Sequence, residues 1–129
     1  MRYKLLILLM SIVLVLNSCI YSDCDDSPRV NAAKASLRSI YDAAERFKLE
    51  VGEYPKVLEE LENGPSDYEG NWSSMLVGGM SALKDPWGNK YFAIYDTDDE
   101  LIIGCYGADG VNGGKGEFDR DLFYPDYYE

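Results

Sequence analysis

The feature that most constrains the fold is a run of apolar residues whose spacing alternates between three and four positions. Such spacing places all of them on one face of a single amphipathic helix. Ser27 followed by Pro28 is a favourable helix start, and Gly52 can adopt the left-handed conformation that ends a helix. We therefore predict a helix of about 24 residues, about 36 Å long. Its apolar face comprises Val30, Ala33, Leu37, Ile40, Ala44, Phe47 and Val51.

This apolar face has two interpretations. It can pack on a sheet of the same chain, or it can form the seam of a coiled coil. The run holds about three heptads, which is near the lower limit for a coiled coil. Packing on the protein's own sheet is therefore the favoured interpretation.

The rest of the chain predicts short elements separated by turns. Residues 56–63 are predicted to form a short helix, and residues 91–95 and 100–106 to form two antiparallel strands joined by an acidic loop. Residues 66–80 show no pattern that assigns them to a helix or a strand. The aromatic tail, residues 122–129, is either a final strand or an arm packed on the domain.

Composition narrows the function classes. The chain has 129 residues, which suits one domain, and its net charge is −11. This acidity argues against nucleic-acid binding, because phosphate contacts require a basic patch. The chain has no His, so the most common general base and every Ser-His or Cys-His nucleophile pair are absent. We expect a non-enzymatic binding or structural domain with no small-molecule substrate.

The first residues predict a signal peptide. Met1–Lys4 is basic, and residues 5–16 form a short apolar run. At 1.5 Å per residue this run reaches about 18 Å, well short of the roughly 30 Å hydrocarbon core of a bilayer. Residues 16–19, LNSC, resemble a bacterial lipobox, which implies cleavage before Cys19 and lipid on its sulfur and amine. A simple transmembrane anchor is the alternative.

The lipobox interpretation divides the N-terminal region in two. Residues 1–18 are then a lipoprotein signal peptide, and residues 19–27 are an acidic tether from lipidated Cys19. We expect the domain to be anchored by lipid to a membrane of the bacterial cell envelope, in the periplasm or another extracytoplasmic space. In that compartment Cys24 and Cys105 either form a disulfide or stay two unpaired thiols.

Residues 107–121 combine flexibility with acidity. Five of these residues are Gly, and Asp109, Asp119 and Asp121 flank the Gly-rich turn. Ordering such a loop costs conformational entropy, so something must hold it. Carboxylate and carbonyl oxygens suit Ca²⁺, whereas Mg²⁺ requires a stricter octahedron. The loop is not an EF-hand, because Val111 occupies the third position. A calcium site and a plain solvated acidic loop are both open on these grounds.

Four motifs in order point to a family. They are GEYP after the long helix, DPWGNKY, a strand, and GADGVNGGKG followed by acids. Together they resemble the major pseudopilin of type II secretion (the GspG family) over about residues 28–122. The resemblance implies an α+β, pseudopilin-like domain over residues 28–129. Its long N-terminal amphipathic helix would pack on a small antiparallel sheet, and Trp87 in the DPWG turn looks like a core residue.

The resemblance also implies a metal and its ligands. In the family a calcium ion holds the Gly- and Asp-rich C-terminal loop. By this resemblance Asp109 and Asp121 look like side-chain ligands, and Asp119 is a further candidate. Backbone carbonyls near Tyr106 and Phe118 would complete the ligand shell.

The N-terminal segment departs from the family. Pseudopilins begin with a short basic leader, a Gly, and a Phe-rich apolar helix that carries Glu at its fifth position and packs in the filament. This chain has neither that cleavage site nor that Glu. Our hypothesis is therefore a lipid-anchored structural or accessory protein related to type II secretion, with other pseudopilins or secretion components as partners.

Two alternatives follow from the same residues. The first is a true major pseudopilin that assembles into a pseudopilus through an atypical N-terminal helix. The second is a hydrolase that uses paired carboxylates such as Asp96 and Glu100. A solvated hairpin turn is the simpler interpretation of that pair.

Overall fold

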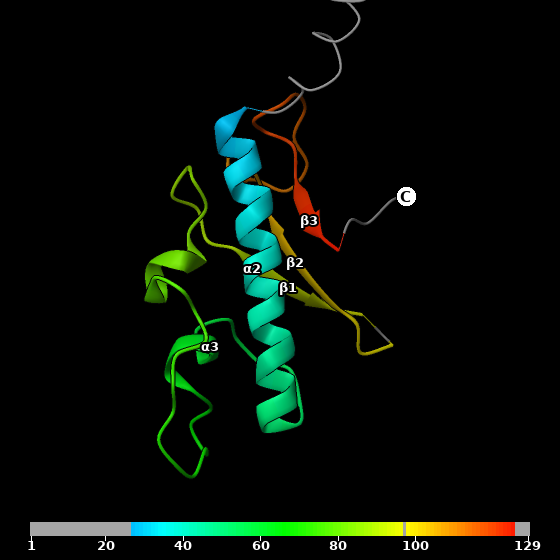
Figure 1. Ribbon diagram of the computed structural model, residues 1–129. Helices are drawn as coiled ribbons and strands as arrows, with labels where there is room; N and C mark the ends of the chain where they lie inside the picture. The colour runs from blue at the N-terminus through cyan, green and yellow to red at the C-terminus, as the bar shows by residue number, and fades with distance from the viewer. Residues whose placement is uncertain (1–26, 97, 126–129) are drawn as a thin grey trace, which may run out of the picture.

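The computed structural model describes residues 27–96 and 98–125 (Figure 1). Helix α2 (Pro28–Val51) lies against a three-stranded sheet, and α3 (Glu60–Asn63) lies beside α2 on the side away from β3 (Leu122–Tyr124). This arrangement confirms the predicted α+β fold. The predicted signal peptide, Cys19, Cys24 and the tether up to residue 26 lie outside the described residues. The elements are α2 (Pro28–Val51), α3 (Glu60–Asn63), a 3₁₀ helix η1 (Gly79–Leu83), β1 (Phe92–Tyr95), β2 (Leu101–Cys105) and β3 (Leu122–Tyr124).

Helix α2 begins and ends where the sequence predicts. Ser27 is extended, with ψ 156°, and its hydroxyl accepts a hydrogen bond from the Val30 amide at 3.3 Å. Pro28 occupies the first turn, where its missing N–H costs nothing. At the other end Gly52 is left-handed, with φ 97°, and its amide donates to the Lys48 carbonyl at 2.8 Å.

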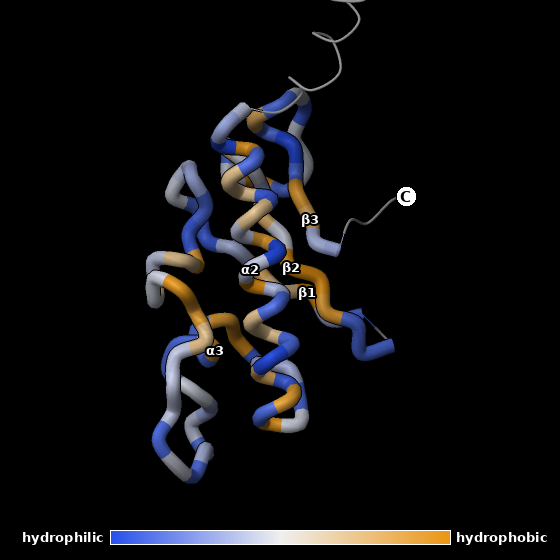
Figure 2. Tube along the Cα trace, in the orientation of Figure 1, coloured by the Kyte–Doolittle hydropathy of each residue, from blue (hydrophilic) through white to orange (hydrophobic). Residues whose placement is uncertain are grey.

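The predicted apolar face of α2 is the face that packs on the sheet. All its predicted members from residue 30 to residue 47 are buried, and Val51 is half-buried. Ala43 is buried as well, so the covered face is wider than the seam of a coiled coil. Helix α2 contacts both β2 and β3, and the tube in Figure 2 shows the orange strand β2 beside it. The interpretation as a helix packed on its own sheet is therefore confirmed.

The sheet has the order β1-β2-β3, and both pairs are antiparallel. Strand β2 is central, and every one of its residues is buried. The paired positions Phe92, Gly104 and Phe123 form one row across the face away from α2. A Cβ on Gly104 would lie 2.6 Å from the Phe92 ring and 2.9 Å from the Phe123 ring. The two rings can cover this position only because Gly has no side chain there. The third strand, β3, lies in the aromatic tail, so residues 122–124 of the tail form a strand and not only an arm.

Two regions differ from the prediction. The predicted helix 56–63 is helical only from Glu60 to Asn63, because so short a segment forms few internal hydrogen bonds for the residues it fixes. The unassigned region, residues 66–80, contains an irregular segment held by tertiary contacts and the first two residues of η1. In that segment Trp72 packs 2.7 Å from the place a Cβ on Gly64 would occupy, and its ring meets the Phe47 ring edge-on at 5.3 Å.

Candidate functional site

The Gly-rich loop between β2 and β3 is closed at its neck. The amide of Ala108 donates to the carbonyl of Phe118 at 2.7 Å. Gly107 lies against the returning segment of the loop, with φ 76°, and a Cβ there would lie 2.5 Å from the Phe118 oxygen and 2.8 Å from the Arg120 oxygen. Only Gly combines this positive φ with this lack of space. The neck therefore brings backbone carbonyls from the C-terminal side of the loop against its N-terminal side.

Two of the predicted ligands bind amides of the loop itself. Asp109 accepts a hydrogen bond from the Val111 amide at 3.0 Å through Oδ1. Asp121 accepts one from the Gly113 amide at 2.9 Å through Oδ2. The other oxygen of Asp121, Oδ1, is buried and has no hydrogen-bond partner. A buried carboxylate oxygen without a donor is costly, so a cation beside Asp121 would be favourable.

The remaining predicted ligands occupy different surroundings. Asp119 is half-buried, and its carbonyl lies so close to Gly114 that a Cβ there would be 1.6 Å away. The Tyr106 ring stacks on Phe92, with ring centroids 4.4 Å apart. Across the residues that the structure describes, no three His, Cys, Asp or Glu side chains form a group able to hold a metal ion. The three aspartates thus share one loop without forming a preformed three-carboxylate cluster.

The DPWG turn supports the loop from below, and the sequence did not predict this contact. The Asn89 side-chain amide donates to the Gly107 carbonyl at 3.0 Å. Asp85 fixes Asn89 in turn, because its Oδ1 accepts from the Trp87 amide at 3.0 Å and from the Asn89 amide at 2.8 Å. Trp87 is half-buried against the core, as expected. The local sequence predicts a turn here, but it contains no pattern that predicts the contact between Asn89 and the Gly107 carbonyl 18 positions away.

Cys105 lies in the core beneath the same loop. Its side chain is fully buried and forms no disulfide within the described part of the chain, and burial raises the pKa of its thiol. A raised pKa disfavours the reactive thiolate, so Cys105 acts as a small apolar residue in the sheet. The predicted alternatives for its pairing with Cys24 stay predictions.

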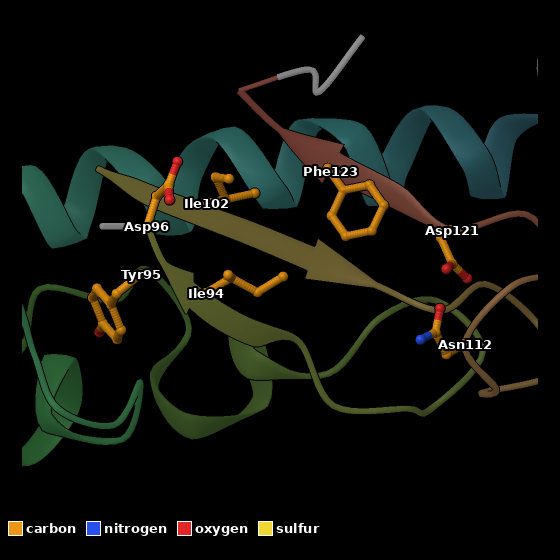
Figure 3. Close-up of a pocket in the computed structure, with 7 residues that line it drawn as sticks. All are labelled: Ile94, Tyr95, Asp96, Ile102, Asn112, Asp121 and Phe123. Carbon is orange, nitrogen blue, oxygen red and sulfur yellow. The ribbon is translucent and has the colours of Figure 1, made fainter. Parts of the chain in front are cut away.

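A hollow of about 500 Å³ lies on the sheet face away from α2. Figure 3 shows Ile94, Ile102 and Phe123 along it, with Asp121 and Asn112 at one end and Asp96 at the other. Asp121 therefore lies where the Gly-rich loop meets the open face of the sheet. Asp96 belongs to the β1–β2 hairpin, where its amide donates to the Glu100 carbonyl at 2.9 Å, as the simpler interpretation of that pair predicts.

One negative finding concerns membranes. Within residues 27–96 and 98–125, no helix has both the length and the apolar character that crossing a bilayer requires.

Comparisons with known proteins point to one family. The family model described as "Type II secretion system (T2SS), protein G" matches residues 21–122. The type II secretion system core protein G of Xanthomonas campestris pv. campestris is 27% identical over 100 residues, which are 77% of this chain and 68% of that protein. Its counterpart from Pseudomonas aeruginosa is 30% identical over 102 residues, which are 75% of this chain and 71% of that protein.

A solved structure shares the fold. The crystal structure of the major pseudopilin from the type 2 secretion system of enterohaemorrhagic Escherichia coli matches with a TM-score of 0.55 and 19% sequence identity, over 74% of this chain and 85% of that one. The family match spans α2, the sheet and the Gly-rich loop together, so the predicted resemblance is confirmed. This chain therefore belongs to the type II secretion system protein G family and carries a major-pseudopilin-like domain.

Proposed function

We propose that this chain is a non-enzymatic, lipid-anchored envelope protein that serves type II secretion as a structural or accessory component. Its pseudopilin-like domain would work beside other pseudopilins or secretion components. Lipid on Cys19 would hold it to a membrane, and a calcium ion would stabilise its C-terminal loop.

The observation that carries the tether is the way α2 begins. A filament helix that ran straight into α2 would need Ser27 to be helical, with its amide bonded to the carbonyl four residues earlier. Instead Ser27 is extended, and its amide donates to the Glu117 carboxylate. The N-cap and Pro28 give α2 a start of its own. Such a start favours a tether over a continuous helix upstream.

The observation that supports calcium is the unpartnered oxygen of Asp121. It lies in a loop whose potential metal ligands are carboxylate and backbone carbonyl oxygens, the hard ligands that Ca²⁺ prefers. Asp109 and Asp121 would hold the ion through their side chains, with Asp119 as a further ligand. Carbonyls near Tyr106 and Phe118 would complete the shell. The bound cation would offset the clustered negative charge and hold the loop closed.

The anchor is tested by metabolic labelling with a palmitate analogue. We expect the wild type to incorporate label and Cys19→Ala to lose it. Cys24→Ala is the matched control, because it removes a neighbouring thiol and should keep the label. Equal labelling of wild type and Cys19→Ala would contradict the lipoprotein interpretation.

The calcium site is tested by thermal unfolding in calcium and in EGTA. When free Ca²⁺ is a hundredfold above its Kd, binding linkage should stabilise the domain by about 2.7 kcal/mol. Asp121→Asn and Asp109→Ala should each remove the difference between the two conditions. Asp98→Asn, an exposed carboxylate on the β1–β2 hairpin, should preserve it. A wild-type melt that is the same in both conditions would refute the site.

The alternative is a true major pseudopilin that assembles through its N-terminal apolar run, and family membership favours it. The mature N-terminus, measured by mass spectrometry, separates the two. An unlipidated chain that retains residues 5–16 would support assembly into a pseudopilus, whereas a lipidated Cys19 at the terminus would support the anchor.

A further inference from the structure

The Gly-rich loop reaches across to the start of helix α2. The backbone amide of Ser27 donates a hydrogen bond to Oε1 of Glu117 at 2.5 Å, although 90 positions separate the two residues in the sequence. Figure 1 shows the orange loop beside the blue first turn of α2. This contact joins the loop that carries the candidate ligands to the residue at which the chain enters the domain.

Glu117 supplies what the first turn of α2 lacks. Helix N-termini leave amides without intrahelical partners and carry a partial positive charge, so an acidic side chain there is stabilising. Helix α2 has no acidic residue in its own first turn. Its cap consists of the Ser27 hydroxyl, which accepts from Val30, and the Ser27 carbonyl, which accepts from Asn31 at 3.0 Å. The carboxylate of Glu117 adds the missing negative charge and binds the amide just before the helix.

The position of Glu117 depends on closure of the loop. Its neighbour Phe118 forms the neck by accepting from Ala108, and Gly107 leaves room for that approach. If the neck opened, Glu117 would leave Ser27, because the loop is rich in Gly and loses little by adopting other conformations. The closed loop and the capped helix start should therefore form and open together.

We propose that Glu117 makes the Gly-rich loop a clamp on the start of α2, so that whatever orders the loop also fixes the point where the tether joins the domain. The contact itself stands on the Ser27–Glu117 geometry. The identity of the ordering agent, calcium, and of the upstream segment, a lipid tether, rests on the proposed function. If calcium orders the loop and a lipid tether precedes Ser27, calcium binding would limit the motion of the domain relative to its lipid anchor.

The experiment is amide hydrogen exchange on the full chain in detergent micelles, in calcium and in EGTA. In the wild type we expect calcium to slow exchange at Ala108 in the neck and also at Ser27 and Val30. Glu117→Ala should speed exchange of the Ser27 amide about tenfold or more, the effect of losing a hydrogen bond to a charged acceptor. In that variant calcium should still slow exchange at Ala108 but no longer at Ser27.

Two further variants keep the test decisive. Lys115→Ala, a change at another exposed residue of the same loop, should leave exchange at Ser27 unchanged. Glu117→Gln keeps a hydrogen-bond acceptor without the charge, so the Ser27 amide should be protected to an intermediate degree. This variant still tests the Ser27–Glu117 contact if Glu117→Ala opens the neck. Unchanged Ser27 exchange in both Glu117 variants would overturn the clamp. If wild-type exchange ignores calcium, the calcium site fails, and the comparison of Glu117 variants in EGTA still tests the clamp.

Discussion

Asp85 is a buried carboxylate with two backbone partners on one oxygen and none on the other. Burial raises its pKa, and the amides that it accepts from offset only part of that effect. Because the folded pKa lies above the ordinary value of 3.8, the folded state favours the protonated carboxyl. The stabilising contribution of that proton is complete below the unfolded pKa and is lost as the pH rises through the folded pKa.

Asp85→Asn imitates the protonated carboxyl and should show this pH dependence directly. Compared with the wild type, the variant should become more stable as the pH rises from below 3.8 to neutrality. Urea unfolding of both proteins across this range measures the difference. Asp98→Asn on the exposed hairpin controls for removal of one negative charge. A difference for Asp85→Asn that does not change with pH would show that burial does not govern this carboxyl.

Gly107 and Gly113 separate two reasons for glycine in the loop. Both have positive φ, 76° and 83°, but a Cβ on Gly113 would meet nothing within 4 Å. Gly113→Ala should therefore cost only the conformational strain, about 1–2 kcal/mol of unfolding free energy. Gly107→Ala adds a clash with the Phe118 carbonyl and should cost clearly more. Equal losses in chemical denaturation would mean that the neck adjusts freely.

Helix α2 is the element that could be predicted in full from the sequence. Its start, its end and its buried face follow from local residues, because capping and periodicity act within a few positions. Strands β1 and β2 were also predictable from short apolar runs, whereas the tail that holds β3 fitted a strand or an arm equally well. The segment between α3 and η1 was not, because Trp72 is placed by Gly64 and by Phe47 on another element. No local pattern encodes such contacts.

The loop shows the same division. Gly and Asp content identified the residues 107–121 and three acidic side chains within them. The contacts that position the loop involve partners 18 and 90 residues away, Asn89 with Gly107 and Ser27 with Glu117. The unpartnered oxygen of Asp121 likewise depends on burial by the folded chain. Prediction from the sequence therefore found candidate ligands but not what holds them.

The packing of α2 on the sheet can be measured with a matched pair of leucines. Leu37 is 1% exposed and belongs to the core, whereas Leu49 on the same helix is 87% exposed. Leu37→Ala should lower the unfolding free energy by about 2–5 kcal/mol, through lost burial and the cavity left behind. Leu49→Ala should change it by about 0.5 kcal/mol or less. Similar losses in thermal or urea unfolding would contradict the observed orientation of α2.

At the scale of the whole molecule, negative charge outweighs the ion pairs that could offset it. The chain carries 23 Asp and Glu against 12 Lys and Arg. Ion pairs such as Lys90–Glu59 at 3.3 Å and Lys48–Asp99 at 3.7 Å lie at the surface, with Lys90 and Asp99 largely exposed. Exposed pairs contribute about 0–1 kcal/mol each. General repulsion among the carboxylates should therefore dominate the effect of salt on stability.

Raising sodium chloride from about 20 mM to about 500 mM in EGTA should raise the melting temperature, because salt screens repulsion between surface charges. A rise of a few degrees corresponds to about 1 kcal/mol for a domain of this size. EGTA removes divalent cations, so the measurement is independent of the proposed calcium site. Asp98→Asn should melt slightly higher at low salt and respond less to salt. A melting temperature that falls with salt would instead show that specific ion pairs, and not net repulsion, govern the stability of this domain.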